Sequence, residues 1–431
     1  MKSGSVNATI DEESQEARPL SGKDGFVPGI AEALSPLGAV STLLVAMIGT
    51  GVVAMPFIFL LCGITLGVIG LAAMAWLAQL AMVCIIRSVQ ISRCVSYEDL
   101  GERAFGMWFS RITDLSLIGL LLGSTAAYII IATNILSVSL PDSLSVPRPT
   151  LFALVALAMF PVCLARTYDG LAAINTFCFT SFVVISVICT VKSVLVREHI
   201  QVDETTQRIS PIIGLILSLP MTSTYMNGHM NVPQVYAELR PQWKRRAIPL
   251  GTAVCVIAFA FYVFAGMVPY LVFHASTETD ILTQLVNTFM AVHSARDPHL
   301  SLAQVLLGLC IVLKTPVIQF PLRSLVLGRF QPDAKLATLP MPQNLLLTAV
   351  CIAAAYLLAV ALPRLDLVIQ IVGATSGVFL VYICPGAFTL GIERRKAADV
   401  WVAVRGWTLV VSGLCISVTA LCAVIVNEVF S

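Results

Sequence analysis

A glycine pair in an apolar stretch is the first candidate for a functional site in this sequence. Residues 43–59 read LLVAMIGTGVVAMPFIF, with Gly49 and Gly51 near the middle and Pro56 five residues further on. Glycine and proline loosen or remove the backbone hydrogen bonds of a helix. Inside a bilayer, the freed backbone groups are tolerated only where they face protein or a water-filled cavity. The stretch therefore predicts a broken membrane helix that offers backbone groups to a ligand; a packing glycine pair is the alternative.

A second stretch, at about 209–237, has the same character. Pro220 and Gly228 bracket a polar cluster in its middle. The cluster consists of Thr222, Ser223, Thr224, Tyr225 and Asn227. We expect this helix to be broken as well, with backbone carbonyls freed in the segment from Thr222 to Asn227.

The elements that must position these residues are membrane helices. Of the 431 residues, 58% are hydrophobic and 12% are charged, whereas soluble domains carry about 25% charged residues. The sequence therefore predicts an all-α polytopic membrane protein whose single transmembrane domain covers 36–431 and contacts the lipid bilayer. Residues 1–35 are polar and lack an apolar signal region, so we expect a disordered cytosolic tail. The charges are confined to loops, and the net charge of +2 gives no indication of nucleic-acid binding.

Eleven apolar runs of roughly 18–25 residues are each long enough to cross a membrane core. They lie at about 38–61, 64–86, 112–139, 150–166, 170–194, 209–237, 247–273, 301–326, 344–362, 366–390 and 405–427. The two broken stretches are the first and the sixth run, so that each opens a set of five. This is the pattern of two inverted five-helix repeats with a binding site between them. Coincidence is the alternative, because glycine and proline are frequent in membrane helices.

The distribution of basic residues predicts the orientation in the membrane. Of the 26 lysines and arginines, 19 fall on the inner segments if the N-terminus is cytosolic, six fall on the other side, and Lys314 falls within a span. The positive-inside rule then places the N-terminus in the cytosol and the C-terminus outside or in a lumen. A plasma membrane and a vacuolar or lysosomal membrane both fit this orientation. Short helices are expected in the inner loop 87–111 and the outer loop 274–300.

Several functional classes find no support in the sequence. The twelve cysteines lie almost all inside apolar runs without a CxxC pair, which is typical of small hydrophobic residues rather than of disulfides or a metal site. No GxSxG, HExxH, Walker or Rossmann pattern is present. We therefore expect neither an enzyme nor a cofactor.

Four segments of the chain resemble the amino acid/auxin permease family, which belongs to the amino acid/polyamine/organocation superfamily. They are IGTGVVAMP in the first span, the SYEDLGERAFG loop, HMNVPQVYAELRPQWKRR after the sixth span, and TPVIQFPLR in the eighth. The resemblance runs from about residue 36 to 428 and is closest in character to the neutral amino acid transporter branch. It implies a LeuT-like, five-plus-five inverted-repeat fold that transports amino acids by alternating access. It also implies a substrate site between spans one, three, six and eight.

The resemblance and the backbone chemistry together suggest how an amino acid would bind. The second half of span one would present free N–H groups and the positive end of a helix dipole to the α-carboxylate. Freed carbonyls of span six would accept from the α-ammonium. The candidate substrate-binding residues are Ile48, Gly49, Thr50, Gly51, Ser124, Tyr128, Thr222, Ser223, Thr224 and Tyr225. This set offers no counter-ion to a cationic side chain, which favours neutral substrates.

Two positions depart from the sodium-coupled members of the family. Those members carry an asparagine four residues before the first glycine of span one, where this chain has Val45. They also carry a threonine two residues before the proline of span eight, where this chain has Lys314. A sodium site needs oxygen ligands, so a valine and a fixed positive charge at these positions disfavour sodium coupling.

Lys314 is a functional candidate in its own right, because charges inside a membrane are costly. Two roles are open for it. A permanent ammonium could substitute for sodium and pin span one to span eight, or the lysine could carry protons, since burial disfavours its charged form. The alternative is snorkelling to an interface. Its position, nine residues before Arg323, which is expected to mark the inner end of the span, argues against snorkelling.

Two further residues are candidates for coupling or gating. His229 matches a histidine that the family carries seven residues before the tyrosine of the span-six segment, and the resemblance implies a role in a gate or a proton linkage, with hydrogen-bonded packing as the alternative. Glu238 is expected to be the acidic partner of the basic cluster at 240–246. A sodium-independent transporter, either proton-coupled or a uniporter, is the favoured function. An amino acid sensor of the same fold, a sodium-coupled symporter and a metal-ion transporter are the alternatives.

Overall fold

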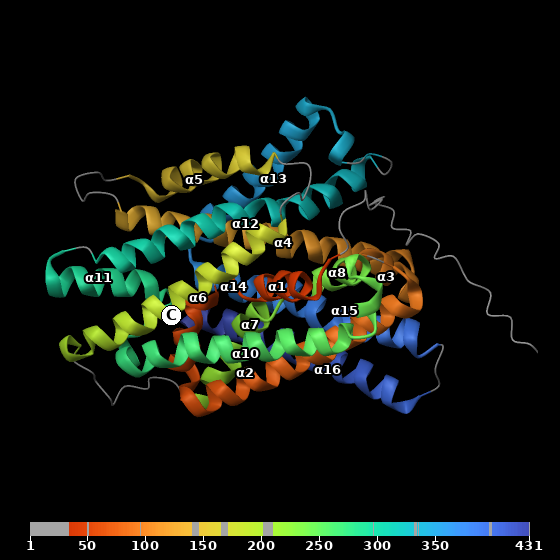
Figure 1. Ribbon diagram of the computed structural model, residues 1–431, viewed down its shortest axis with the longest axis horizontal. Helices are drawn as coiled ribbons and strands as arrows, with labels where there is room; N and C mark the ends of the chain where they lie inside the picture. Colours follow the sequence, from red (N-terminus) through yellow and green to blue (C-terminus); the bar gives the residue numbers. More distant parts are fainter. Residues whose placement is uncertain are drawn as a thin grey trace, which may run out of the picture.

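The computed structural model describes residues 34–49, 51–94, 96–139, 146–164, 171–200, 210–295, 297–331, 334, 336–395 and 399–430. Within these residues the chain forms a bundle of helices that lie side by side along the long axis, with α1 and α7 near its middle (Figure 1). The predicted all-α class is confirmed. Residues 1–33 and Thr50 lie outside the described residues, so the predicted tail and one site candidate stay predictions.

The helices follow the predicted apolar runs. The long ones are α1 (Pro36–Met47), α2 (Gly51–Ser92), α4 (Met107–Ser139), α5 (Arg148–Cys163), α6 (Leu171–Val196), α7 (Pro211–Tyr225), α10 (Ala247–Phe273), α11 (Ile281–His293), α12 (Pro298–Phe330), α13 (Met341–Ala361) and α16 (Val400–Phe430). The short ones are α3 (Tyr97–Phe105), α8 (Val232–Glu238), α9 (Pro241–Lys244), α14 (Leu365–Val372) and α15 (Cys384–Phe388). Single 3₁₀ turns occur at Arg197–His199, His229–Asn231, His274–Ser276 and Leu336–Thr338, and π-helical turns at Gly373–Gly377, Phe379–Ile383 and Thr389–Glu393.

Both predicted interruptions are present. In the first span, α1 ends at Met47 and α2 begins at Gly51; in the sixth, α7 ends at Tyr225 and α8 begins at Val232. The prolines do not mark the breaks, because Pro56 and Pro220 lie inside α2 and α7. The breaks lie instead at the glycine-containing segments between α1 and α2 and between α7 and α8.

Eight helices in the described part are long and apolar enough to cross a membrane, so the predicted count of eleven is not confirmed. The difference has a physical origin in the breaks and turns. α2 includes the second half of span one and all of span two, divided at Gly63, whose φ of 73° lies in the region that favours glycine. α5 and α7, with 16 and 15 residues, are shorter than the roughly 20 residues of a full span.

Polar contacts gather at the two ends of the bundle. At one end, the Arg87 and Arg405 guanidinium groups lie 3.1 and 3.2 Å from the Glu393 carboxylate. At the other, Lys192 pairs with Asp297. Arg87, Arg405 and Glu393 belong to segments that were predicted to lie on the inner side, and Lys192 and Asp297 to segments predicted on the outer side. The ion pairs therefore agree with the predicted sides of these segments.

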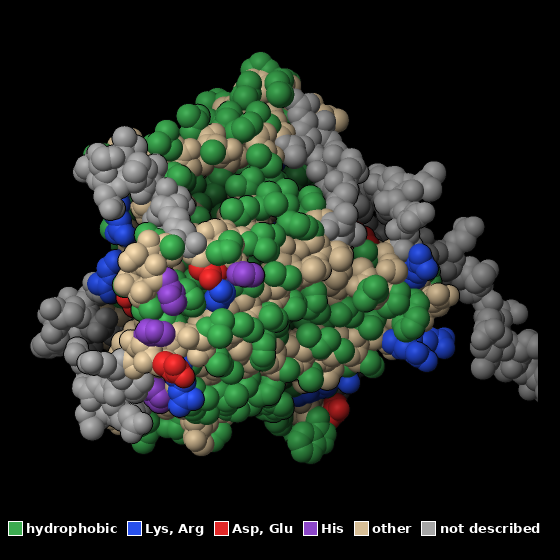
Figure 2. All heavy atoms as spheres, turned by 60° about the vertical axis from the view of Figure 1, so that its left-hand side comes forward, with side chains coloured by type: hydrophobic (Ala, Val, Ile, Leu, Met, Phe, Trp, Pro, Cys, Tyr) green, Lys and Arg blue, Asp and Glu red, His purple; other side chains and the backbone are tan. Residues whose placement is uncertain are grey.

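Helices also form in the two loops where short ones were expected. α3 begins after Ser96, whose hydroxyl accepts from the Asp99 N–H at 3.2 Å. α11 begins after Asp280, whose carboxylate accepts from the N–H of Leu282 at 3.1 Å. In Figure 1, α3 and α11 lie at opposite ends of the bundle. Figure 2 shows histidine, acidic and basic side chains gathered at the end that holds α11, beside a broad hydrophobic flank.

Candidate functional site

Lys314 joins α12 to the end of α1. Its Nζ donates to the carbonyl oxygen of Val45 at 2.7 Å, and only 7% of the residue is exposed. A Cβ built on Gly49 would lie 3.6 Å from the same Nζ, and the Phe182 ring centroid is 5.5 Å away. The last carbonyls of a helix lack intrahelical donors and carry the negative end of the helix dipole, so an ammonium is stabilised there. The burial excludes snorkelling in this structure.

Gly51 allows a tyrosine ring to lie directly against the start of α2. A Cβ at this position would come within 2.5 Å of Cδ1 of Tyr225, a residue that is itself 4% exposed. Gly228 in the second break likewise lies against α1. A Cβ on Gly228 would be 2.8 Å from Cγ of Met47 and 3.3 Å from the carbonyl oxygen of Leu43. Both Gly51 and Gly228 therefore lie where the two interruptions touch and where a larger residue would not fit.

The start of α2 keeps part of its predicted capacity to bind an anion. The first four N–H groups of a helix have no intrahelical acceptor. The Val52 N–H is already used, since it donates to the carbonyl oxygen of Gly49 at 3.3 Å. The first turn of α2 is buried, and the positive end of its helix dipole would stabilise a carboxylate there.

The unwound part of the sixth span is shorter than predicted. α7 continues through Tyr225, and the carbonyl oxygens of Thr222 and Thr224 accept from the N–H groups of Met226 and Asn227 at 3.0 and 3.3 Å. The prediction of freed carbonyls is therefore wrong for Thr222 and Thr224. The reason is local, because a proline removes only its own N–H and the chain recovers the helical pattern after Pro220.

The hydroxyl groups in this part of α7 are also engaged. Thr222 donates to Ser218 O at 2.8 Å, and Thr224 lies 3.0 Å from Pro220 O and 3.4 Å from Ile369 O of α14. Such hydrogen bonds back to the preceding turn are common for threonine in helices. The two threonines therefore donate to the protein and keep only acceptor capacity.

Two polar atoms beyond α7 have no hydrogen-bond partner among the described residues: Oδ1 of Asn227 and Nδ1 of His229. Asn227 is 8% exposed and His229 is fully buried. The other ring nitrogen of His229, Nε2, lies 2.8 Å from the carbonyl oxygen of Ala78. A carbonyl only accepts, so Nε2 carries the hydrogen and Nδ1 is an acceptor. The second break thus offers two buried acceptors.

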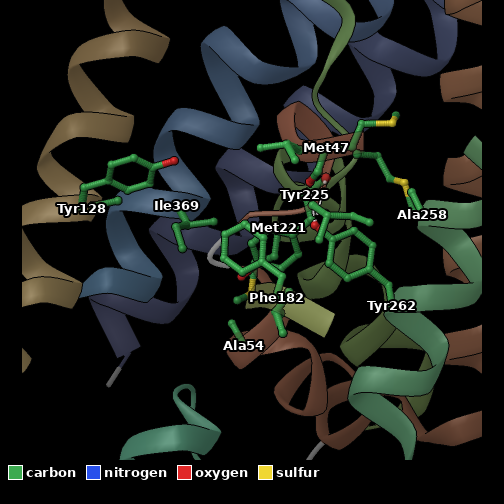
Figure 3. Packing of buried hydrophobic residues seen from close by; sticks show 14 of the residues in the cluster. Met47, Ala54, Tyr128, Phe182, Met221, Tyr225, Ala258, Tyr262 and Ile369 are labelled. Carbon is green, nitrogen blue, oxygen red and sulfur yellow. Dashed lines mark hydrogen bonds between the residues drawn. The ribbon is translucent and has the colours of Figure 1, made fainter. Parts of the chain in front are cut away.

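Tyr128 of α4 lies apart from the breaks (Figure 3). Figure 3 shows Tyr128 apart from Met47, Tyr225 and Tyr262, with Ile369 between them in that view. Tyr128 is buried and Ser124 is half-buried. The structure brings Gly49, Gly51, Tyr225 and Lys314 together, and does not place Tyr128 beside them.

α4 and α12 are linked through residues that the sequence reasoning did not single out. Gln319 Nε2 donates to Thr125 Oγ1 at 3.1 Å. One further turn along α12, Arg323 is fully buried, and its Nη1 donates to Asn344 Oδ1 at 3.0 Å and Thr348 Oγ1 at 3.1 Å. Polar groups of α13 therefore stabilise the charge of Arg323 inside the bundle, and its expected place at the inner end of the span stays a prediction.

Tyr262 on α10 was also missed. Its hydroxyl lies 2.7 Å from the carbonyl oxygen of Met47 and 3.3 Å from that of Tyr225, and the residue is fully buried. The two tyrosine rings lie side by side with centroids 6.1 Å apart (Figure 3). No local signal distinguishes Tyr262 from the other tyrosines in apolar runs.

Glu238 does not pair with the basic cluster as expected. Its carboxylate accepts from Gln234 Nε2 at 3.1 Å, and within the described residues no ion pair joins it to residues 240–246. Burial raises the pKa of the Glu238 carboxyl, against the lowering effect of the Gln234 hydrogen bond. Its carbonyl oxygen accepts from the Leu34 N–H at 2.9 Å, so α8 ends beside the start of α1. Lys244 and Arg246 instead lie over aromatic rings.

Known proteins resemble this chain both in sequence and in fold. A family model described as transmembrane amino acid transporter protein matches residues 32–426. The chain belongs to this family. Its relatives are membrane transporters, not enzymes, and the predicted resemblance is confirmed.

Individual relatives are 21–26% identical to this family member over the aligned residues. The amino acid transporter AVT6E of Arabidopsis thaliana is 26% identical over 380 residues, which cover 83% of this chain and 76% of that protein. Solute carrier family 38 member 10 of Mus musculus is 24% identical over 405 residues, covering 89% and 36%. The putative sodium-coupled neutral amino acid transporter 10 of Xenopus laevis is 21% identical over 399 residues, covering 88% and 37%. The chain thus spans little more than a third of the latter two proteins.

Solved structures show the same fold. A manganese transporter of Eremococcus coleocola aligns with a TM-score of 0.59 at 12% identity, covering 92% of this chain and 87% of that one. A Na⁺-coupled sialic acid symporter aligns with a TM-score of 0.51 at 12% identity, covering 92% and 90%. At such identities the likeness concerns the fold alone, and the predicted transporter fold class is confirmed. In the described part of this chain, no group of three or more His, Cys, Asp or Glu side chains could hold a metal ion.

Proposed function

We propose that this protein is a secondary amino acid transporter that works by alternating access, favours neutral substrates and does not use sodium. The observation that carries the proposal is the 2.7 Å hydrogen bond from Lys314 to the carbonyl oxygen of Val45. A backbone oxygen at the end of an interrupted helix is the kind of ligand that a sodium ion would need. Here a buried ammonium occupies it, and a second cation within a few ångströms would be strongly repelled.

The preference for neutral substrates rests on the groups at the two breaks. The segments 48–51 and 226–231 contain no acidic residue. The first turn of α2 offers N–H groups to the carboxylate of an amino acid, and Asn227 Oδ1 and His229 Nδ1 are buried acceptors suited to its ammonium. The name of the Xenopus relative includes neutral amino acids, which agrees with this proposal, and sodium coupling, which Lys314 argues against.

The energy source follows from the role of Lys314. As a permanent ammonium that ties α12 to α1, it would serve a uniporter; as a group that releases and regains a proton, it would serve a proton-coupled transporter. In either case we propose a cytosolic N-terminus and an outer or luminal C-terminus, in a plasma membrane or in a vacuolar or lysosomal membrane. The rival is a sensor of the same fold that binds amino acids without moving them.

Amino acid flux into proteoliposomes with imposed Na⁺ or pH gradients tests the proposal. Lys314→Met keeps the length of the side chain and removes the charge. Lys192→Met is the matched control, because it removes a half-buried lysine that pairs with Asp297 away from the breaks. The control is expected to keep the ion dependence of the wild type.

Each outcome has a distinct meaning. Uptake that follows the pH gradient, ignores Na⁺ and loses its pH dependence in Lys314→Met supports the proton carrier. Uptake that needs no gradient and is merely slowed in Lys314→Met supports the uniporter. Na⁺-driven uptake by the wild type would overturn the sodium-independent proposal, and saturable binding without flux would favour the sensor.

A further inference from the structure

The hydroxyl of Tyr262 lies between the ends of the two helices that are interrupted. Met47 is the last residue of α1 and Tyr225 is the last residue of α7. The Tyr262 oxygen is 2.7 Å from the carbonyl oxygen of the first and 3.3 Å from that of the second. One side chain of α10 therefore reaches the carboxyl ends of both helices at once.

The chemistry of these three groups makes the arrangement specific. The terminal carbonyls of a helix lack an intrahelical donor and carry its negative partial charge. Two such ends directed at one point repel each other, and a buried carbonyl without a donor is costly. A tyrosine hydroxyl has a single hydrogen to donate. It can bond fully to one carbonyl or be shared between the two, but it cannot satisfy both.

We propose that Tyr262 is a positioning residue that acts as a shared C-terminal cap of α1 and α7 and holds the two breaks in register. In this structure the shorter distance places the hydrogen on α1. If α1 moves away from α10 during the transport cycle, the hydrogen turns to Tyr225, so the position of one interrupted helix affects the stability of the other. Its role in transport rests on the proposed function; its role as a cap does not.

A purely structural tyrosine is the alternative, and the chain contains a matched example. The hydroxyl of Tyr97 on α3 donates to the carbonyl oxygen of Leu380 at 3.3 Å, and this residue is 2% exposed. Tyr97→Phe removes one buried hydroxyl–carbonyl hydrogen bond, between α3 and the π-helical turn Phe379–Ile383. Tyr262→Phe keeps the ring against Tyr225 and removes only the shared donor.

The first measurement is hydrogen–deuterium exchange of the full chain in detergent or nanodiscs, which requires no substrate. Tyr262→Phe is expected to exchange faster than the wild type in peptides that cover 44–55 and in peptides that cover 222–232. Tyr97→Phe is expected to leave both regions unchanged. Faster exchange in only one of the two regions would overturn the shared cap, and so would unchanged exchange in both.

The second measurement is amino acid uptake. Tyr262→Phe is expected to raise KM about tenfold, the scale of one lost buried hydrogen bond, while Tyr97→Phe lowers the melting temperature but leaves KM unchanged. An unchanged KM in Tyr262→Phe, with a melting temperature lowered only as far as in Tyr97→Phe, would reduce Tyr262 to a packing residue. If the wild type transports no amino acid, the proposed function fails, and the exchange experiment still decides the cap.

Discussion

The two interrupted spans differ in how their exposed backbone and neighbouring polar atoms are satisfied. At the first break, the protein supplies its own partners: Lys314 donates to Val45, Tyr262 donates to Met47, and a ring covers Gly51. At the second break, buried acceptors on Asn227 and His229 have no partner among the described residues. At the first break the carbonyls at the end of α1 are thus bound by the protein, whereas the second break has two buried acceptors without a described partner.

The two helix interruptions are therefore not equivalent as binding sites. A break whose carbonyls are bound by a lysine and a tyrosine is tied to its neighbouring helices, and its motion is coupled to theirs. A break with free acceptors can still bind a group with several donors, such as an ammonium. We therefore assign the structural linkage to the first interruption and the recognition of the substrate ammonium to the second.

The largest effect is expected from closing the narrow space at the first break. Gly51→Ala would place a Cβ 2.5 Å from Cδ1 of Tyr225 in a ring that is buried. Overpacking of this kind costs about 1–3 kcal/mol, so uptake should fall by about tenfold or more. Gly308→Ala is the control, since a Cβ there meets nothing within 4 Å. Equal uptake by the two variants would show that Tyr225 moves aside freely and that the first break is not closed.

A smaller effect is expected at the second break. Asn227→Ala removes a buried acceptor that we assign to the substrate ammonium, and KM should rise about tenfold. Asn175→Ala is the control, because Asn175 already donates to Thr42 Oγ1 at 3.3 Å. The control should lose stability without a change in KM. A KM for Asn227→Ala equal to that of the wild type would remove the distinction between the two breaks.

The smallest effect is expected outside both breaks, at the pair of Lys192 and Asp297. Partial burial acts to raise the pKa of the Asp297 carboxyl, but hydrogen bonds from Lys192 and the N–H groups of Leu300 and His299 hold it below its usual value. A depressed carboxyl pKa stabilises the fold above the unfolded value, about 3.9, and this contribution is lost as pH falls through the folded value.

Thermal unfolding as a function of pH measures this contribution. Asp297→Asn should unfold about 2 °C lower than the wild type at neutral pH, and the difference should shrink as the pH falls below the unfolded value toward the lower folded value. The KM for amino acid uptake by Asp297→Asn should not change. A raised KM in this variant would mean that the ion pair at the end of the bundle is coupled to the breaks, and the comparison of the two breaks would have to include it.

Much of the fold could be predicted because it depends on local chemistry. Long apolar runs predicted the helices, and glycine within two of these runs predicted the interruptions near Gly49 and Gly228. The burial cost of an isolated charge was enough to select Lys314. A prediction that required a partner from another element was less successful, because Glu238 bonds to Gln234 rather than to the basic cluster.

The sequence by itself determined where the backbone could not remain helical and which side chain would be costly to bury, because both properties belong to a residue and its immediate neighbours. Only the tertiary structure decided which atoms meet at the breaks. That Lys314 binds the carbonyl of Val45, and that Tyr262 reaches Met47 and Tyr225, depends on how α12 and α10 pack against α1 and α7. Those contacts join residues far apart in the chain, for which apolar periodicity carries no information.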